Sequence, residues 1–175
     1  MENGIGILKE YYDGGKLKFE GEYLNGNKNG KGKEYDMCSI FEGEYKNGKR
    51  NGKGKEYIKN KLIFEGEYLN GKKWNGKGLD IFNNHIYELK EGKGFIKEYY
   101  NQNGNIKFEG EFINGERNGK GKEYDGMNRV KYIGEYLNGN RNGKGKEYEN
   151  GILIFEGEYL YNYRNKGKEY AKEIL

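Results

Sequence analysis

A glycine-rich segment that recurs along the chain constrains the fold more than any other feature of this sequence. Residues 19–32 read FEGEYLNGNKNGKG, and copies of this segment begin at Phe41, Phe64, Phe108 and Tyr132, with a degraded copy at Phe155 and an altered one at Tyr87. The first aromatic residues of successive copies lie 21 to 24 residues apart. A period of about 23 residues indicates an array of one small unit.

Each unit alternates with a period of two, as a β-strand does. Leu17, Phe19, Gly21 and Tyr23 fall on one face, and the Lys and Glu residues between them fall on the other. Residues 25–30, NGNKNG, favour positive φ and predict a turn, after which the chain returns as a second strand. The sequence therefore predicts an all-β fold, an elongated, twisted antiparallel sheet ribbon of tandem β-hairpins.

Cross-strand charge favours one register for the hairpin. Pairing Tyr23 with Gly32 sets Glu22 opposite Lys33, whereas a slip of one residue moves Lys33 to the aromatic face. In the favoured register the glycines share a face with the aromatic residues and leave slots for their rings. We interpret the recurring Glu residues as a Glu–Lys ladder that stabilises the sheet, and not as catalytic carboxylate pairs.

A second, longer duplication overlies the repeat. Residues 4–12, GIGILKEYY, match residues 92–100, GKGFIKEYY, and the units that follow match in order. We predict one repeat array over residues 1–175, with half-arrays at about 4–78 and 92–170 and an altered junction at 79–91. At this junction Leu89 stands where the first glycine of the unit belongs.

The composition indicates a thin structure. Hydrophobic residues make up 33% of the chain and charged residues 34%, which is too little apolar surface for a thick core. The 18 tyrosines and 8 phenylalanines sit at fixed positions of the repeat. Because aromatic side chains bury large areas, they can hold a thin sheet together.

Charge and targeting signals narrow the class of protein. The net charge of +4 comes from finely interleaved acidic and basic residues, so nucleic-acid binding is not expected. Cys38 is the single cysteine, the N-terminal segment lacks a signal-peptide pattern, and no run approaches the roughly 20 apolar residues of a membrane span. We expect a cytoplasmic protein, peripheral at a membrane if it binds lipid.

The sequence offers little for catalysis. It has one serine (Ser39), no threonine, Cys38 and one histidine (His85), and Cys38 and His85 lie two repeats apart. Residues 71–78, GKKWNGKG, fit a phosphate-binding spacing, but Gly78 stands where serine or threonine would follow. Clusters with metal-ligand spacing are absent from the sequence. We predict no enzymatic activity, no cofactor and no metal site.

Two sets of residues are candidates for contacts with a partner. The first lies where the repeat breaks and consists of Trp74, Phe82, His85, Tyr87, Tyr161 and Tyr163. The second is the set of basic residues that we expect at exposed turn tips along one edge: Lys28, Lys49, Arg50, Lys72, Lys73, Arg117, Arg141 and Arg164. Such an edge either maintains solubility or attracts an anionic membrane surface.

The unit, aromatic-Glu-Gly-Glu-aromatic followed by Asn-Gly and Asn-Gly-Lys-Gly, resembles the MORN repeat (membrane occupation and recognition nexus). The resemblance covers residues 4–170, although the usual tryptophan is Tyr23 in the first unit and the frequent histidine is Asn29. Linking segments such as YYDGGKLKFEGEY are also similar to YwqK antitoxin-like repeat proteins. The resemblance implies an extended β-array that binds partners and carries no transferable catalytic residue.

The resulting hypothesis is a non-enzymatic scaffold whose aromatic and glycine face meets a protein partner or a second copy, as a homodimer. Two alternatives stay open. One is peripheral binding to an anionic membrane or lipid through the basic edge. The other is an antitoxin-like or immunity-like protein that blocks a partner.

Overall fold

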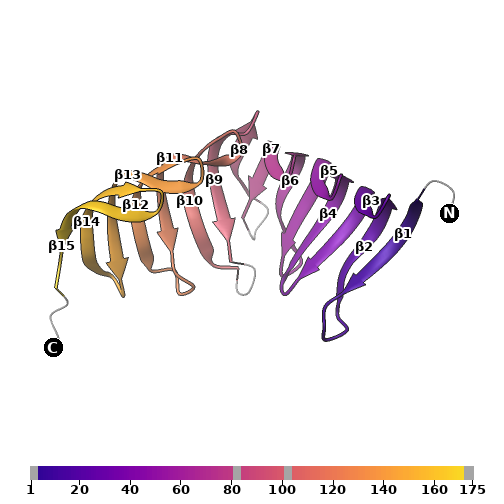
Figure 1. Cartoon of the computed structure of the whole chain (residues 1–175), viewed down its shortest axis with the longest axis horizontal. Coiled ribbons are helices and arrows are strands. Elements are labelled where there is room, and N and C mark those ends of the chain that lie inside the picture. Colours follow the sequence, from indigo (N-terminus) through magenta and orange to yellow (C-terminus); the bar gives the residue numbers. More distant parts are fainter. Residues whose placement is uncertain (1–3, 81–83, 101–103, 172–175) are drawn as a thin grey trace. The chain divides into compact units, whose positions relative to one another are not determined.

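The computed structural model describes residues 4–80, 84–100 and 104–171, which form antiparallel strands and no helix. The chain divides into two compact units, residues 1–91 and 92–175. The predicted all-β class and the tandem hairpin repeats are confirmed. Each unit is described by itself below, with the strand labels of Figure 1.

In the described part of the first unit, eight strands lie side by side in the order of the sequence. They are β1 (Ile5–Tyr11), β2 (Leu17–Leu24), β3 (Asn27–Asp36), β4 (Ser39–Lys46), β5 (Lys49–Ile58), β6 (Lys61–Leu69), β7 (Lys72–Leu79) and β8 (His85–Lys90). At the altered junction β7 and β8 still pair, with Leu89 opposite Gly76.

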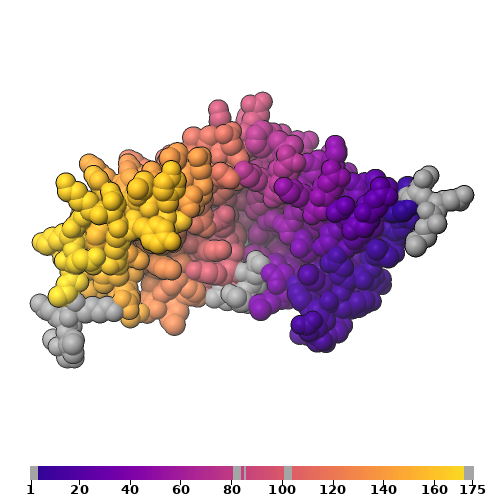
Figure 2. Space-filling model, viewed as in Figure 1, coloured from indigo at the N-terminus to yellow at the C-terminus, as the bar shows by residue number. Residues whose placement is uncertain are grey.

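The second unit repeats this arrangement with seven strands among its described residues. They are β9 (Lys93–Tyr99), β10 (Ile106–Ile113), β11 (Glu116–Tyr124), β12 (Val130–Leu137), β13 (Asn140–Glu149), β14 (Ile152–Leu160) and β15 (Tyr163–Glu169). Within each unit the colours of Figure 2 follow one another as stripes of surface, so each hairpin contacts mainly its neighbours in sequence.

The turns of the hairpins are tighter than the sequence predicted. Only Asn25 and Gly26 lie between β2 and β3, both with positive φ (49° and 78°), and the same pair recurs at Asn47 and Gly48. Asparagine followed by glycine suits a two-residue turn with positive φ at both positions, whose twist matches that of the paired strands. The predicted turn over residues 25–30 is therefore wrong, and residues 27–30 belong to β3.

The predicted register is wrong by two residues, for the same reason. Gly21 pairs with Gly32 and Glu20 with Lys33, whereas Tyr23 pairs with Lys28. Between these pairs lies a bulge, in which residues 29–31 of β3 oppose Glu22 alone. Because the error is an even number of residues, the faces were assigned correctly: the glycines and the aromatic rings share one face.

The two aromatic residues and the glycines of each repeat of about 23 residues form a layer that we call the ring-over-glycine layer. This layer is the core of both compact units. Phe19 and Tyr23 are 0% and 7% exposed. A Cβ added at Gly32 would lie 2.4 Å from the Cζ atom of Phe19. Tyr45 of the next hairpin meets Phe19 edge to face, with 5.2 Å between ring centroids. Rings from two hairpins therefore fill each pair of glycines, as predicted.

The opposite face carries the Glu–Lys ladder. Lys33 pairs with Glu20 on one side and Glu42 on the other, and Lys55 lies between Glu42 and Glu65. The Nζ atom of Lys55 lies 3.0 Å from Glu65, and in the second unit the Nζ atom of Lys146 lies 3.0 Å from Glu156. The ladder interpretation is confirmed for these first glutamates of each unit.

Candidate functional site

The second glutamate of each unit has a local structural role. Glu44 accepts a hydrogen bond from the backbone N–H of Lys53 (2.9 Å), and Glu135 accepts one from that of Lys144 (2.7 Å). The carboxylate of Glu44 covers Gly52, whose φ is +102°, and a Cβ there would lie 2.0 Å from the carboxylate oxygen. These glutamates satisfy bulge amides that would otherwise lack a partner in the ladder.

Six of the eight basic residues predicted at exposed turn tips lie instead in strands, over the ring-over-glycine layer. Because the turn is only two residues long, the residue two positions after it faces the same side as the aromatic rings. This places Lys28 4.0 Å from the ring centroid of Phe19, and the guanidinium of Arg141 4.2 Å from that of Tyr132. The six residues that this corrects are Lys28, Arg50, Lys73, Arg117, Arg141 and Arg164.

The other two basic candidates, Lys49 and Lys72, are exposed and begin their strands directly after the turns. They keep the predicted position at the edge. An anionic surface approaching the turns of the first unit would meet these two lysines before the cations that lie over the rings.

Each ring-bound cation also contacts at least one carboxylate. In the first unit, Arg50 contacts Glu34 at 3.1 Å and Glu56 at 2.9 Å, and Lys73 contacts Glu56 at 2.7 Å. Lys28 contacts Glu10 at 3.4 Å. Cation, ring and carboxylate from neighbouring hairpins thus form one layered contact, which links the hairpins in addition to their backbone pairing.

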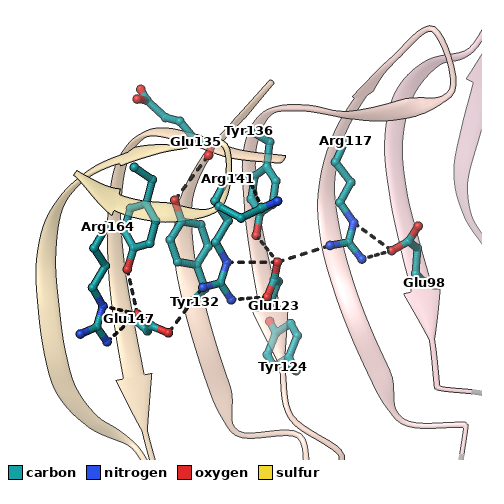
Figure 3. Close-up of polar contacts among 12 residues, drawn as sticks. Glu98, Arg117, Glu123, Tyr124, Tyr132, Glu135, Tyr136, Arg141, Glu147 and Arg164 are labelled. Atoms are coloured by element: carbon teal, nitrogen blue, oxygen red, sulfur yellow. Dashed lines mark hydrogen bonds and ion pairs between the residues drawn. The ribbon is translucent and has the colours of Figure 1, made fainter. Parts of the chain in front are cut away.

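The second unit extends this arrangement into a continuous chain of charges, which we call the Arg–Glu chain (Figure 3). Arg117 contacts Glu98 and Glu123, Arg141 contacts Glu123 and Glu147, and Arg164 contacts Glu147 and Glu169. Its members are Glu98, Arg117, Glu123, Arg141, Glu147, Arg164 and Glu169. Two tyrosines join it: Tyr136 donates to Glu123 (2.9 Å) and Tyr159 to Glu147 (3.0 Å).

Burial and charge set the pKa values in this chain. Burial alone would raise the pKa of Glu123, but the hydrogen bond and the charge of Arg141 outweigh it, and the pKa is lowered. Burial and the hydrogen bond to Glu147 raise the pKa of Tyr159 to about 12. Glu123 therefore stays ionised and Tyr159 stays protonated at neutral pH. In these charge states the two residues act as a fixed acceptor and a fixed donor of the network.

Trp74 and the candidates at the altered junction lie in different environments. Trp74 is half-buried in the bulge of β7, next to Lys73, which pairs with Tyr68. Tyr87 is 6% exposed and lies over Gly78, where an added Cβ would meet its ring at 2.0 Å, so it belongs to the core. The backbone of His85 pairs with Leu79 in β8. Phe82 lies outside the described residues.

The last turn differs from the other turns of the hairpins. Tyr161 and Asn162 replace Asn-Gly and have φ values of 48° and 72°. Tyr161 is 64% exposed and Tyr163, which follows the turn, is 77% exposed. A bulky residue such as tyrosine rarely adopts positive φ, and residues held in this region often have a functional role. The turn is held in place by Asn162, whose N–H donates to Arg141 O (3.0 Å) and whose Oδ1 accepts from Arg141 N–H (2.8 Å).

A row of exposed apolar residues, not predicted from the sequence as a contact surface, lies beside these tyrosines. Ile113, Leu137 and Leu160 end the first strands of three successive hairpins, β10, β12 and β14, and are 41%, 44% and 49% exposed. Leu160 pairs directly with Tyr163. In the first unit the row is interrupted, because Lys46 occupies the matching position. The sequence does contain a signal for this row, namely an apolar residue directly after the second aromatic residue of the repeat of about 23 residues. We call Ile113, Leu137, Leu160, Tyr161 and Tyr163 the tyrosine edge.

Within residues 4–80, 84–100 and 104–171, no group of three or more His, Cys, Asp and Glu side chains is arranged to hold a metal ion. Over the same residues, no helix has the length and apolar character needed to cross a membrane.

A family model described as MORN repeat matches the chain at residues 19–36, 41–62, 108–127 and 132–152. Two matched segments lie in each unit. A comparison with curated proteins gave no match.

Proposed function

Because this chain is built of MORN repeats, which commonly serve as protein-interaction or membrane-binding modules, we propose that it is a non-enzymatic protein-binding scaffold whose contact surface is the tyrosine edge. The observation that carries the proposal is the last turn, where Tyr161 and Asn162 replace Asn-Gly and the exposed Tyr163 follows directly. Tyrosine is enriched among the residues that dominate binding energy at protein interfaces.

The ring-over-glycine layer is a poor contact surface by comparison. Its rings are between 0% and 7% exposed and are covered by each other and by the cations above them. The aromatic and glycine face is therefore a weaker candidate for the contact surface than the tyrosine edge, because glycine lets the rings fold down onto the backbone. What a partner would find on this face is a set of charges already paired within the chain.

The tyrosine edge has the chemistry that this face lacks. Three aliphatic side chains follow one another along successive hairpins, and strands are spaced about 4.8 Å apart, so neighbouring members of the row lie roughly 10 Å apart. Tyr161 and Tyr163 extend the row at its end with two rings that combine an apolar body and a hydroxyl. A partner that covers this edge would bury aliphatic and aromatic surface without displacing a charge from the Arg–Glu chain.

A capture experiment with matched variants tests the proposal. The tagged chain would be incubated with an extract of the native cell, beside a variant carrying Tyr161→Asn and Tyr163→Asn. Asparagine occupies the matching turn position of the other hairpins and tolerates positive φ, so the variant should fold. Tyr11→Asn serves as the control, since Tyr11 is 57% exposed but lies in β1.

We expect at least one partner to be retained by the wild type and by Tyr11→Asn and to be lost from the double variant. Capture of the same proteins by all three chains would refute the tyrosine edge as the contact surface.

Binding to an anionic membrane has less support as the second candidate function. Six of the eight cations assigned to it are held in ion pairs and over rings, which reduces their attraction to phosphate groups. Co-sedimentation with phosphatidylserine vesicles at low salt tests this candidate. Absence of binding there would rule it out, and binding that falls as salt rises would support it.

A further inference from the structure

The outer edge of β15 is the open end of the second unit's sheet. β15 (Tyr163–Glu169) pairs with β14 on one side, and within the described part of that unit no strand pairs with its other side (Figure 1). An open edge exposes a row of backbone donors and acceptors that can pair with another strand. The question is which strand chemistry this edge fits.

The interior of the array shows what lies beside a strand of this type. β13 pairs on its far side with β14, where Lys144 faces Glu158, Gly145 faces Gly157 and Lys146 faces Glu156. The same pattern joins β5 to β6, through two Lys–Glu pairs that flank a pair of glycines. A return strand carrying Lys-Gly-Lys is thus followed by a strand carrying Glu-Gly-Glu.

β15 carries the same three residues without that neighbour. Lys166, Gly167 and Lys168 match residues 144–146, and they pair on the inner side with Glu158, Gly157 and Glu156. Glu156 makes its ion pair with Lys146 instead (3.0 Å), and neither Lys166 nor Lys168 makes an ion pair with a described residue. Gly167 is exposed, whereas Gly145 is buried.

The aromatic side of the edge is incomplete in the same way. Tyr132 contacts Tyr159 of the following hairpin, with 5.0 Å between centroids, but the one described ring that meets Phe155 is that of Tyr159 in its own hairpin. The side chain of Glu169 is 65% exposed, against 19% for Glu147, which accepts a hydrogen bond from Tyr159. Phe155 is itself buried (3% exposed) beneath Arg164, but no other described ring takes the place beside it that Tyr159 takes beside Tyr132.

From this complementarity we infer that the outer edge of β15 accepts an extended strand of the pattern aromatic-Glu-Gly-Glu-aromatic from another protein, by addition to the sheet. The two glutamates lie opposite Lys166 and Lys168, the glycine lies opposite Gly167, and the second aromatic ring covers Phe155 and donates to Glu169. Backbone pairing supplies affinity in this mode of recognition, and the alternating side chains supply specificity.

A second copy of this chain is a poor occupant through either of its end strands. Two β15 strands paired about Gly167 would set Lys166 opposite Lys168 twice. The outer edge of β1 offers Ile7 and Lys9 on the polar face, and no carboxylate there to face the lysines. Like charges directly opposite one another destabilise a sheet. Neither end strand of a second copy therefore supplies the acidic residues that this edge fits.

Peptide titration with a charge swap tests the inference. The probe is a fluorescent peptide with the sequence ILIFEGEYL of residues 152–160, and the swapped probe has lysine in place of both glutamates. Each is titrated against the full chain and against the variant Lys166→Glu with Lys168→Glu, and binding is followed by fluorescence anisotropy. The Tyr161→Asn, Tyr163→Asn variant is included, because the inference does not depend on the tyrosine edge.

We expect the wild type to bind the acidic peptide about tenfold more tightly than the swapped peptide, and the lysine variant to reverse this preference. The tyrosine variant should bind the acidic peptide as the wild type does, even if it loses its cellular partner. Affinity that is absent, or that does not follow the charge swap, would overturn the inference. So would light scattering that shows a dimer of the chain which the lysine variant abolishes.

Discussion

Adding one methyl group at Gly32 should destabilise the first unit by about 2–3 kcal/mol, the upper part of the range for overpacked cores. A Cβ there would lie 2.4 Å and 2.7 Å from two atoms of the Phe19 ring and 3.2 Å from the ring of Tyr45. Ordinary carbon–carbon contacts are about 3.5–4.0 Å, so the rings would have to move by roughly 1 Å. Phe19 is 0% exposed and has no empty space to enter.

A matched glycine in the same unit provides the control. Gly6 lies in β1, and no atom lies within 4 Å of a Cβ added to it. Neither Gly6 nor Gly32 has positive φ, so backbone strain does not distinguish them. Gly6→Ala should be neutral or stabilise by about 0.5 kcal/mol, because glycine in a strand has the greater entropy to lose on folding.

Urea unfolding followed by selective excitation of tryptophan measures the difference. Trp74 is the sole tryptophan and lies in β7, so its fluorescence reports on the unit that contains both glycines. With a slope of about 1–3 kcal/mol per molar urea, Gly32→Ala should lower the midpoint by about 1 M or more. The cost should fall below about 1 kcal/mol in a Phe19→Leu background, because the clashing ring atoms are gone.

Two outcomes would refute this reasoning. One is a Gly32→Ala variant as stable as Gly6→Ala. The other is a cost that is the same with and without the Phe19 ring, which would show that the ring is not what the glycine makes room for.

Three further predictions concern the polar networks. Arg141→Met should destabilise the second unit by about 2–4 kcal/mol, because it leaves Glu123 and Glu147, 17% and 19% exposed, without their shared cation. Arg164→Met, at a more open position, should cost about 1 kcal/mol. Urea unfolding followed by near-ultraviolet circular dichroism compares the two variants, and equal costs would contradict the burial argument. Arg141 lowers the pKa of Glu123, so the ionised carboxylate contributes to stability at neutral pH. This contribution is lost as the pH falls below about 4.3 and through the folded-state pKa. The free energy of unfolding measured against pH should decrease in that range, and the decrease should be smaller in Glu123→Gln. Glu135→Ala should speed hydrogen exchange at the Lys144 amide, while Glu135→Gln, which keeps an acceptor oxygen, should change it less; unchanged exchange in both would show that the carboxylate does not cap the bulge.

The alternation of the repeat was sufficient to predict the strands, the hairpins and the shared face of rings and glycines. It could not predict the register, because a bulge such as the one at Glu44 depends on a carboxylate reaching back to a backbone amide, which no periodicity reveals. That one difference moved Lys28 and Arg50 from the turn to the face above the rings. Charged residues are exposed on average, so charge alone predicts an exposed position. A lysine or arginine is nevertheless stable in a partly buried position when adjacent strands supply an aromatic ring and a carboxylate.

Candidate contact residues could be predicted from the sequence where they differ from the repeat pattern, and could not be predicted where they conform to it. Tyr161 and Tyr163 stand out because tyrosine replaces the asparagine that the preceding hairpin has in its turn and directly after it. Leu137 and Leu160 occupy a position that is apolar in most units, so only their exposure in the structure identifies them as surface.

Within each compact unit, the second aromatic ring of a hairpin such as that of Tyr45 or Tyr136 rests on a glycine of the hairpin before it and completes that hairpin's core. This gives the array a tolerance that globular cores lack. Duplicating or deleting a whole unit of about 23 residues joins one standard interface to another and needs no compensating change. Inserting a single residue within a strand would turn its rings toward the lysine ladder. Length is therefore free to vary in this molecule in steps of one hairpin, while the spacing inside each hairpin is fixed.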